Sequence, residues 1–476
     1  MLTRDSIGKS LRIDYQGRTL HWQDFTWLID CWHEWLSTMD LPSQCRVMTN
    51  LPFDAKLMAL FYACMERGYA FIAPTTYHFA WDNTNSLAMP NLIIVADRSW
   101  VYAPNVQVAP NFADYQPAIY ETQCRDTDVA MVAFTSGSSG ERKLVMHTHR
   151  SLAYSAQVAM PLYDIKDRVG LYLMPSHLGH FTVCTLPAFM VGCHIVFGTS
   201  TDPRCGAEQL LTLAVDKMMM FPWSWDWTGQ TTFSHRPSYF TGGTVIGQNF
   251  IANMLARGVS QVHVIYGMTE APPPITIKTV TPDTLAEYDP MWLGDLMGGW
   301  RYQIVDGLLW LGTDSNDGVG FDAKGNSLCQ DGWLHTNDAC RFTDKLMFIG
   351  REYHIRREDQ LISVADMRDI LHRHVLADWK TDLDYVLIPI KHAGVDYIDL
   401  CLRQYVPNLT VEQVNSVLLD HLSPGHTIDH VVLIDRPFPL NGVKLDASLL
   451  KQRVDRLIYV NHANRGETGS SSATPD

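Results

Sequence analysis

Up to about residue 350, the sequence alternates between short apolar runs and segments with helical periodicity. Residues 57–67 have the pattern of a helix, and residues 69–72 directly after them form a short apolar run. Further apolar runs stand at 92–95, 131–134 and 262–266. Strands that alternate with helices are typical of mostly parallel sheets covered by helices. The sequence therefore predicts an α/β fold, with mixed, mostly parallel sheets and helices in a large N-terminal domain.

The pattern changes after Arg351. Apolar runs at 385–390 and 397–402 flank a short turn and predict a β-hairpin. A helix is expected at 411–422, a strand at 431–434 and a last helix at 447–458. We therefore predict a small α+β domain that acts as a mobile lid. The expected domains are 1–351 for nucleotide and acid binding, 352–462 for the mobile C-terminal domain, and 463–476 for a disordered polar tail.

Composition excludes several classes of protein. Hydrophobic residues make up 46 % of the 476 residues and charged residues 18 %, which excludes a mainly disordered chain. The net charge is −14, and no run of Lys or Arg supplies the basic face that a duplex DNA binder needs. We therefore expect no nucleic-acid partner.

Cysteine usage bears on the compartment. The ten cysteines are scattered singly without a CxxC pair, which disfavours zinc ribbons and thioredoxin-type motifs. Such cysteines are typical of reduced, buried thiols, and the first residues have no apolar run like that of a signal peptide. The most apolar long stretch, 181–198, contains several polar residues and predicts a buried helix followed by a strand rather than a membrane span. The sequence thus indicates a cytoplasmic protein.

The apolar run at 131–134 leads directly into a loop rich in glycines and hydroxyl side chains. Glycines let the backbone approach a ligand closely, and hydroxyls with backbone N–H groups form an anion-binding concavity. A lysine adds a positive charge on a flexible stem. The loop suits nucleotide phosphates, although its spacing is not that of the Walker A pattern, and an ordinary surface loop is the alternative. The candidate residues are Thr135, Ser136, Gly137, Ser138, Ser139, Gly140 and Lys143.

The string TSGSSGERKLVMHTHRSL around this loop resembles the phosphate-loop signature of the adenylate-forming superfamily, which includes acyl- and aryl-CoA synthetases, nonribosomal peptide adenylation domains and luciferases. The family signature is TSG[ST][ST]GxPK, then Gly-Val and a histidine six residues after the lysine. Lys143, Val145 and His149 match it, whereas Arg142 replaces the usual proline and Leu144 the usual glycine.

Further segments resemble the family's motifs in the correct order. They are PSHLG at 175–179, YGMTE at 266–270, GWLHTND at 332–338, Gly350-Arg351, and Lys444 after Asn441-Gly442. The resemblance implies an ATP-dependent, AMP-forming ligase. In such enzymes a carboxylic acid attacks ATP to give an acyl-adenylate, and a thiol of CoA or of a carrier protein's phosphopantetheine arm then displaces AMP.

The resemblance also implies roles for single residues. The loop residues above with Lys143 would hold the β- and γ-phosphates of ATP, Thr269 would contact the α-phosphate, and Glu270 would hold Mg²⁺, which prefers oxygen ligands. Tyr266 would stack on adenine beside Gly243, Asp338 would bind the ribose with Arg351 nearby, and Lys444 would stabilise charge during adenylate formation. The alternatives are a loop acid for Glu270, an ordinary turn at Gly243 and a surface lysine at Lys444.

The acid pocket is expected around His177, Gly267, Trp223 and Asp226. Three tryptophans within residues 223–227 predict either an aromatic pocket wall or plain core, and Asp226 either a contact to a substrate amino group or a solvated loop acid. A metal bound by His177 and His180 is disfavoured because no third ligand follows. The aspartate that α-amino-acid-activating members carry near residues 180–182 is absent, which disfavours a standard α-amino acid. We expect a small aryl or acyl acid.

Three departures from the family pattern limit the resemblance. Residues 350–363 are one residue shorter than the corresponding family segment, and Asp359 stands where the family has a glycine near its thiol tunnel. A charge there weakens the case for free CoA and favours a carrier-bound arm. Asn337 replaces the glycine before the ribose-binding aspartate. A nucleotide-binding member without catalysis and a luciferase-like enzyme without thioester formation therefore stay open.

Overall fold

The structure is a computed structural model of the chain. It describes residues 1–72, 91–96, 106–112, 115–134, 144–198, 203–221, 232–313, 317–351, 354–357, 360–375, 385–392, 395–402, 409–422, 424–434, 440–441, 444–445, 450 and 454.

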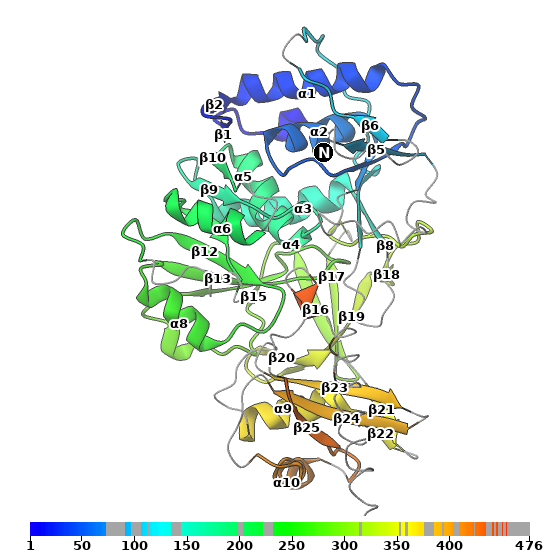
Figure 1. The fold of residues 1–476 in the computed structure, drawn as a ribbon. Coiled ribbons are helices and arrows are strands. Elements are labelled where there is room, and N and C mark those ends of the chain that lie inside the picture. The colour runs from blue at the N-terminus through cyan, green and yellow to red at the C-terminus, as the bar shows by residue number, and fades with distance from the viewer. Residues whose placement is uncertain are drawn as a thin grey trace, which may run out of the picture. The chain divides into compact units, whose positions relative to one another are not determined.

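A six-stranded sheet contains the first apolar runs of the sequence (Figure 1). Its order is β6-β5-β3-β4-β7-β8, and all neighbours are parallel except β7 and β8. The strands are β3 (Arg46–Thr49), β4 (Ala70–Ile72), β5 (Leu92–Ala96), β6 (Val106–Val108), β7 (Val129–Phe134) and β8 (Leu144–Thr148). The predicted helix at 57–67 is α2 (Ala55–Glu66), which contacts α1 (Trp22–Ser37). Asp54 caps α2 by accepting hydrogen bonds from the backbone of Lys56 and Leu57.

A nine-stranded sheet in the order β15-β14-β13-β12-β11-β9-β10-β1-β2 follows. Its six central strands are parallel, and β2, β14 and β15 are antiparallel to their neighbours. The strands are β1 (Arg12–Tyr15), β2 (Arg18–His21), β9 (Arg168–Leu171), β10 (His194–Phe197), β11 (Lys217–Met219), β12 (Ser238–Gly242), β13 (Gln261–Tyr266), β14 (Thr276–Val280) and β15 (Asp295–Leu296). The helical segments in this part are η1 (Arg4–Ser6), α3 (His149–Ala159), η3 (Met160–Leu162), α4 (Leu178–His180), η4 (Phe181–Thr185), α5 (Leu186–Val191), α6 (Pro203–Thr212), α8 (Gln248–Ala256) and η6 (Leu285–Glu287).

The apolar stretch 181–198 is the helical pair η4 and α5 followed by strand β10, which confirms the sequence prediction. Phe181, Leu186 and Phe189 are fully buried, so the apolar composition serves the core. Within the described ranges, the helices are all too short or too polar to cross a membrane. All ten cysteines are free thiols, and eight of them are buried.

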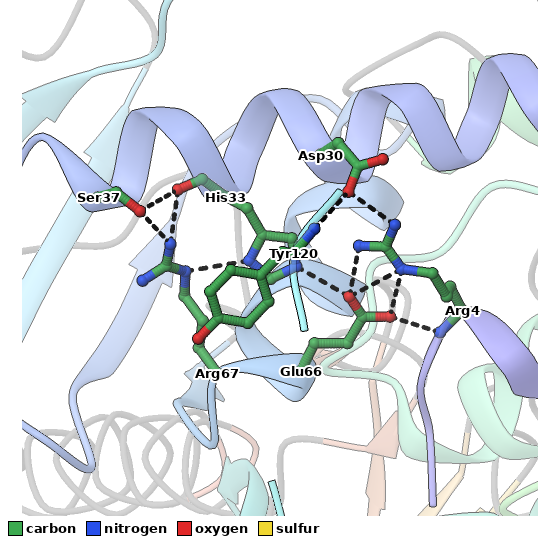
Figure 2. Close-up of polar contacts among 7 residues, drawn as sticks. All are labelled: Arg4, Asp30, His33, Ser37, Glu66, Arg67 and Tyr120. Carbon is green, nitrogen blue, oxygen red and sulfur yellow. Dashed lines mark hydrogen bonds and ion pairs between the residues drawn. The ribbon is translucent and has the colours of Figure 1, made fainter. Parts of the chain in front are cut away.

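A buried polar network joins the N-terminus to α1 and α2 (Figure 2). Arg4 on η1 pairs with Glu66 at 2.7 Å and with Asp30 at 2.6 Å. His33 Nε2 lies 2.9 Å from the Glu66 carboxylate, and Arg67 Nε donates to His33 Nδ1 at 3.0 Å. Arg4 and Glu66 are partners of opposite charge, and Arg67 donates hydrogen bonds to the His33 ring and backbone, so this network is compatible with burial.

The remaining strands form smaller sheets. One consists of β16 (Trp300–Val305), β17 (Leu308–Thr313), β18 (Cys329–Gln330), β19 (Trp333–Phe342) and β20 (Leu346–Arg351). Two further pairs are β21 (His354–Arg357) with β22 (Gln360–Ser363), and β26 (Leu440–Asn441) with β27 (Lys444–Leu445).

The predicted C-terminal hairpin is β23 (Tyr385–His392) and β24 (Val395–Leu402), and the predicted strand at 431–434 is β25 (His430–Leu433), parallel to β24. Helices α9 (Val364–His374) and α10 (Val411–His421) belong to the same small core. The fully buried residues of this core include Met367, Leu371, Leu400, Val414 and Leu418. The predicted α+β arrangement is therefore present.

Contacts divide the chain into two compact units, with the main transition between Thr336 and Asn337. The second unit contains residues 337–476 together with two short pieces, 136–141 and 304–309. The functional boundary at 351/352 stays a prediction. Most of the last predicted helix, 447–458, and the tail 463–476 lie outside the described residues.

Candidate active site

The YGMTE segment begins at the carboxyl end of β13, where ligands bind in open α/β sheets. Tyr266 is the last residue of the strand, and its carbonyl accepts a hydrogen bond from Ile275 N–H at 2.9 Å. Gly267 follows at a point where a Cβ atom would lie 2.6 Å from Pro273 Cβ, so only glycine fits. Met268 and Ala271 exchange backbone hydrogen bonds of 3.0 and 3.2 Å. The segment is thus a tight turn.

Thr269 and Glu270 occupy the tip of this turn. Both residues are half-buried, and within the described part of the chain neither side chain makes a hydrogen bond or ion pair. Their backbone is held instead. Gly320 N–H donates to the Glu270 carbonyl at 2.9 Å, and His147 Nε2 lies 2.8 Å from the Thr269 carbonyl oxygen. The turn therefore presents one hydroxyl and one carboxylate from a fixed backbone.

Glu270 is a suitable ligand for Mg²⁺ that arrives with a nucleotide. Mg²⁺ is usually bound by one or two carboxylates together with substrate phosphates and water, rather than by a cage of protein ligands. In the described ranges, no three His, Cys, Asp or Glu side chains gather in a way that would hold a metal ion by themselves. A single half-buried carboxylate fits the nucleotide-bound form of this ion.

The neighbouring strand β12 also ends in glycines. A Cβ atom on Gly242 would lie 2.2 Å from the Ile265 carbonyl oxygen, so this glycine lets β12 and β13 approach closely. Gly243 follows with a φ of +80°, a left-handed conformation that glycine adopts without strain. Gly243 directly follows β12, and Tyr266 is the last residue of β13, the parallel strand beside it. Both residues of the predicted adenine pair therefore lie at the carboxyl ends of these strands.

Asp338 and Arg351, the predicted ribose pair, are register partners on the antiparallel strands β19 and β20. The Asp338 residue is 3 % exposed. Asn337 before it has a φ of +59°, which is the left-handed region. Asparagine tolerates this region better than most residues. The asparagine that replaces the family glycine therefore keeps a glycine-like backbone.

His177 directly precedes the short helical segment α4, and His180 is the last residue of that segment. His177 is half-buried and precedes the helix, whereas His180 is 1 % exposed and packs edge-on against Tyr172 and Phe53. Burial lowers the pKa of His180 to about 3, so its ring is neutral. Its Nε2 atom is buried without a hydrogen-bond partner among the described residues.

His149, the histidine of the phosphate-loop signature, is fully buried at the start of α3. Its Nδ1 accepts a hydrogen bond from Leu2 N–H at 3.3 Å. Burial lowers the pKa of His149 to about 4. This histidine thus holds the N-terminal segment.

Several predicted site residues lie outside the described residues: Thr135 to Gly140, Lys143, Trp223, Asp226 and Asp359. The structure describes the strands that flank the phosphate loop, β7 and β8, which are antiparallel neighbours with Phe134 opposite Leu144. Lys444 lies on β27 opposite Asn441. The roles of all these residues stay predictions. Sequence reasoning missed His147, because its contact to Thr269 spans 122 positions and no local pattern reveals it.

The comparisons with known proteins agree on one family. The model for the AMP-binding enzyme family matches residues 75–308, which includes the phosphate loop and the YGMTE turn. This match covers just under half of the 476 residues, and over this region the chain is similar to that family. ATP-bound MatB from Rhodopseudomonas palustris superimposes with a TM-score of 0.76 at 15 % identity, over 94 % of this chain and 96 % of that one. O-succinylbenzoate coenzyme A synthetase from Bacillus subtilis, in complex with AMP, gives a TM-score of 0.73 at 16 % identity, over 94 % and 96 %. These likenesses confirm the predicted α/β fold, with its large sheets and helices.

Curated relatives are CoA ligases. The chain is 25 % identical to 4-coumarate–CoA ligase-like 9 of Arabidopsis thaliana over 368 residues, which is 71 % of this chain and 64 % of that protein. It is 21 % identical to medium-chain fatty-acid–CoA ligase of Escherichia coli K12 over 424 residues, or 76 % of this chain and 73 % of that one. The match thus spans just under two thirds of the Arabidopsis protein's length.

Proposed function

We propose that the protein is an ATP-dependent carboxylic acid–thiol ligase that forms an acyl-adenylate and then a thioester. The observation that carries this proposal is the fixed turn after β13, which presents Thr269 and Glu270 at the end of a parallel strand, within the region that matches the AMP-binding enzyme family. In the first step a carboxylate oxygen bonds to the α-phosphorus of ATP, and pyrophosphate leaves. In the second step a thiolate bonds to the acyl carbon, and AMP leaves.

Each part of ATP would have its own set of ligands. Tyr266 and Gly243 would contact the adenine, and Asp338 with Arg351 the ribose. Thr269 would donate its hydroxyl to an α-phosphate oxygen. The loop from Thr135 to Gly140 with Lys143 would hold the β- and γ-phosphates. Mg²⁺ held by Glu270 would neutralise phosphate charge.

Lys444 would supply the positive charge for the first step. Negative charge grows on the carboxylate and α-phosphate oxygens as the new bond forms, and a fixed cation stabilises it. The small C-terminal domain would then rotate and present residues near 355–359 for thioester formation, a hinge-type change. One domain would in this way serve both steps.

The acid would be a small aryl or acyl acid. His177, Gly267, Trp223 and Asp226 are the residues that we expect to line its pocket.

Two features bear on the acceptor. Relatives that are CoA ligases favour CoA, whereas the charge of Asp359 favours a carrier-bound phosphopantetheine arm. A cytoplasmic location belongs to the proposal and is supported by the ten free thiols.

Pyrophosphate release with a panel of acids tests the proposal. The panel contains octanoate, 4-coumarate and o-succinylbenzoate, each with ATP and MgCl₂. We expect release that depends on both the acid and ATP. Addition of CoA or a holo-carrier protein should then yield a thioester. The shortened segment 350–363 favours a second candidate, a nucleotide-binding member without catalysis. ATP binding without pyrophosphate release for any acid would support that candidate.

A further inference from the structure

A buried histidine at a position that the phosphate-loop signature does not specify contacts the backbone of the YGMTE turn. His147 lies on β8, directly after the phosphate loop, and its side chain is fully buried. Its Nε2 atom lies 2.8 Å from the carbonyl oxygen of Thr269. A carbonyl oxygen only accepts hydrogen bonds, so Nε2 carries the proton and donates it.

The other ring nitrogen is consistent with this tautomer. Nδ1 of His147 lies 3.4 Å from Ser151 Oγ on α3, whose one proton points either to this nitrogen or to the Thr148 carbonyl oxygen at 3.2 Å. Burial lowers the pKa of His147 to about 4, so the ring is neutral in neutral solution. The Nε2–H group of His147 is therefore present as a donor throughout neutral solution.

The position of the ring is fixed from both sides. His147 is opposite Met131 in the β7–β8 ladder. Met146 exchanges two backbone hydrogen bonds of 2.8 Å with Phe321. At Gly320 a Cβ atom would lie 2.9 Å from His147 Cε1, so glycine leaves just enough room for the ring. The Gly320 N–H donates to the Glu270 carbonyl, and the two carbonyls at the tip of the turn are thus held by neighbouring groups.

Donors continue along the turn. Ser155 Oγ donates to the Pro272 carbonyl at 3.0 Å, and Thr182 Oγ1 donates to the Pro273 carbonyl at 2.6 Å. The backbone from Thr269 to Pro273 is therefore held from β8, α3 and η4. His147 is the side chain in this set that acts on Thr269 itself.

We propose that His147 is a positioning residue for adenylate formation, which holds the Thr269 carbonyl so that the Thr269 hydroxyl and the Glu270 carboxylate meet the α-phosphate and its Mg²⁺. This inference rests on the proposed function of the turn. A misplacement of about 1 Å in a reacting geometry costs about 10²-fold in rate. The loss of the donor should therefore act on turnover more than on acid binding.

Three variants separate positioning from packing. His147→Leu removes the donor and keeps an apolar side chain of similar size, whereas His147→Gln has an amide nitrogen that reaches the place of Nε2. His263→Leu is the matched control, because His263 is also a buried histidine with a pKa lowered to about 4, but its Nδ1 contacts Thr279 Oγ1 at 2.9 Å. Circular dichroism checks that each variant folds. If His147→Leu does not fold, His147→Asn replaces it, because its amide ends near Nδ1 and does not reach the carbonyl.

The first readout is pyrophosphate release with the most active acid of the panel. We expect kcat to fall about 10²-fold in His147→Leu with little change in KM for the acid, and to recover in His147→Gln. The MgCl₂ concentration for half-maximal rate should rise in His147→Leu, because Glu270 is displaced. Unchanged kcat in His147→Leu, or an equal loss in His263→Leu, overturns the proposal.

The second readout needs no acid and no turnover. Calorimetry measures the affinity for ATP in the presence of MgCl₂ and in the presence of EDTA. The ratio of the two affinities is the gain in ATP affinity that the metal provides. We expect His147→Leu to lose most of this gain, and His147→Gln and His263→Leu to keep it. If no acid releases pyrophosphate from the unaltered protein, the proposed function fails, but this comparison still decides the role of His147. An unchanged gain in His147→Leu overturns it.

Discussion

The guanidinium of Arg4 lies against the carboxylate of Glu66, with 2.7 Å between Nη2 and Oε2 (Figure 2). Glu66 is fully buried, and Arg4 Nε contacts both of its carboxylate oxygens at 3.0 Å. The Arg4 backbone N–H donates to the same carboxylate at 2.7 Å. This one acid at the end of α2 therefore fixes the N-terminal segment on the first unit.

Glu66→Ala should strongly destabilise the first unit. The substitution leaves the Arg4 charge largely buried without its main partner, and such a loss typically costs roughly 3–5 kcal/mol of unfolding free energy. Urea unfolding followed by tryptophan fluorescence measures the change. Asp126→Ala, which removes the exposed ion pair with Arg150, is the control and should leave the unfolding midpoint nearly unchanged. Equal midpoints for Glu66→Ala and the unaltered chain would contradict the prediction.

Acid should destabilise the fold through its buried histidines. Burial lowers the pKa of His147, His149 and His263 to about 4 and that of His180 to about 3, against 6.5 for the exposed side chain. Between about pH 6.5 and 4 the unfolded chain binds more protons than the native one, so stability is present above this window and is lost as pH falls through it. Each histidine contributes roughly 1.4 kcal/mol per pH unit inside the window.

Asp54 acts in the opposite direction, because burial raises its pKa to about 6 and favours its protonated form in the native state. The four histidines outnumber Asp54, so the net stability should still fall as the pH falls. Urea midpoints at about pH 7 and about pH 5 check this expectation. His263→Gln should reduce the difference between the two midpoints. A midpoint at the lower pH that equals or exceeds the other would show that these rings are not held neutral.

Lys143→Ala should weaken nucleotide use. A charged hydrogen bond to a phosphate typically contributes enough that its loss costs roughly ten- to hundredfold in affinity. We expect KM for ATP with MgCl₂ to rise by that factor, while KM for the acid stays within the error of the measurement. Initial rates of pyrophosphate release give both constants. An unchanged KM for ATP would mean that the Ser/Gly loop does not bind the phosphates.

Lys444→Ala should separate the two steps of the reaction. Removal of one fixed cation from the first transition state should lower the rate of adenylate formation by about 10²- to 10³-fold. Thioester formation from supplied acyl-adenylate should survive, because the lysine acts only in the first step. Near-normal pyrophosphate release by the variant would move the role to another lysine, with Lys451 the first to examine.

Local sequence patterns predicted the elements well, because each depends on neighbouring residues. The run 262–266 became β13, and the hairpin at 385–402 pairs around the predicted turn. Contacts between distant segments were not predictable in this way. His147 and Thr269 are joined through a sheet and a turn that no spacing rule connects. The Arg4 network likewise joins a 3₁₀ turn to two helices across 62 positions.

Asn337 offers the sharpest test of the ribose site, because its backbone conformation is separable from its side chain. Its φ of +59° is easy for glycine, tolerable for asparagine and strained for a β-branched residue. Asn337→Gly should therefore leave KM for ATP unchanged, whereas Asn337→Val should raise it as the strained backbone shifts Asp338.

The control for strain alone is Asp331→Val. Asp331 is also exposed, has a φ of +51° and lies six positions earlier in the chain, away from the predicted ribose ligand. Forcing a left-handed conformation on valine costs about 1–2 kcal/mol at either place, so both valine variants should lose similar stability in thermal unfolding. Only Asn337→Val should also raise KM for ATP. If the two variants change KM alike, strain rather than the position of Asp338 explains the effect, and Asp338 is not the ribose ligand.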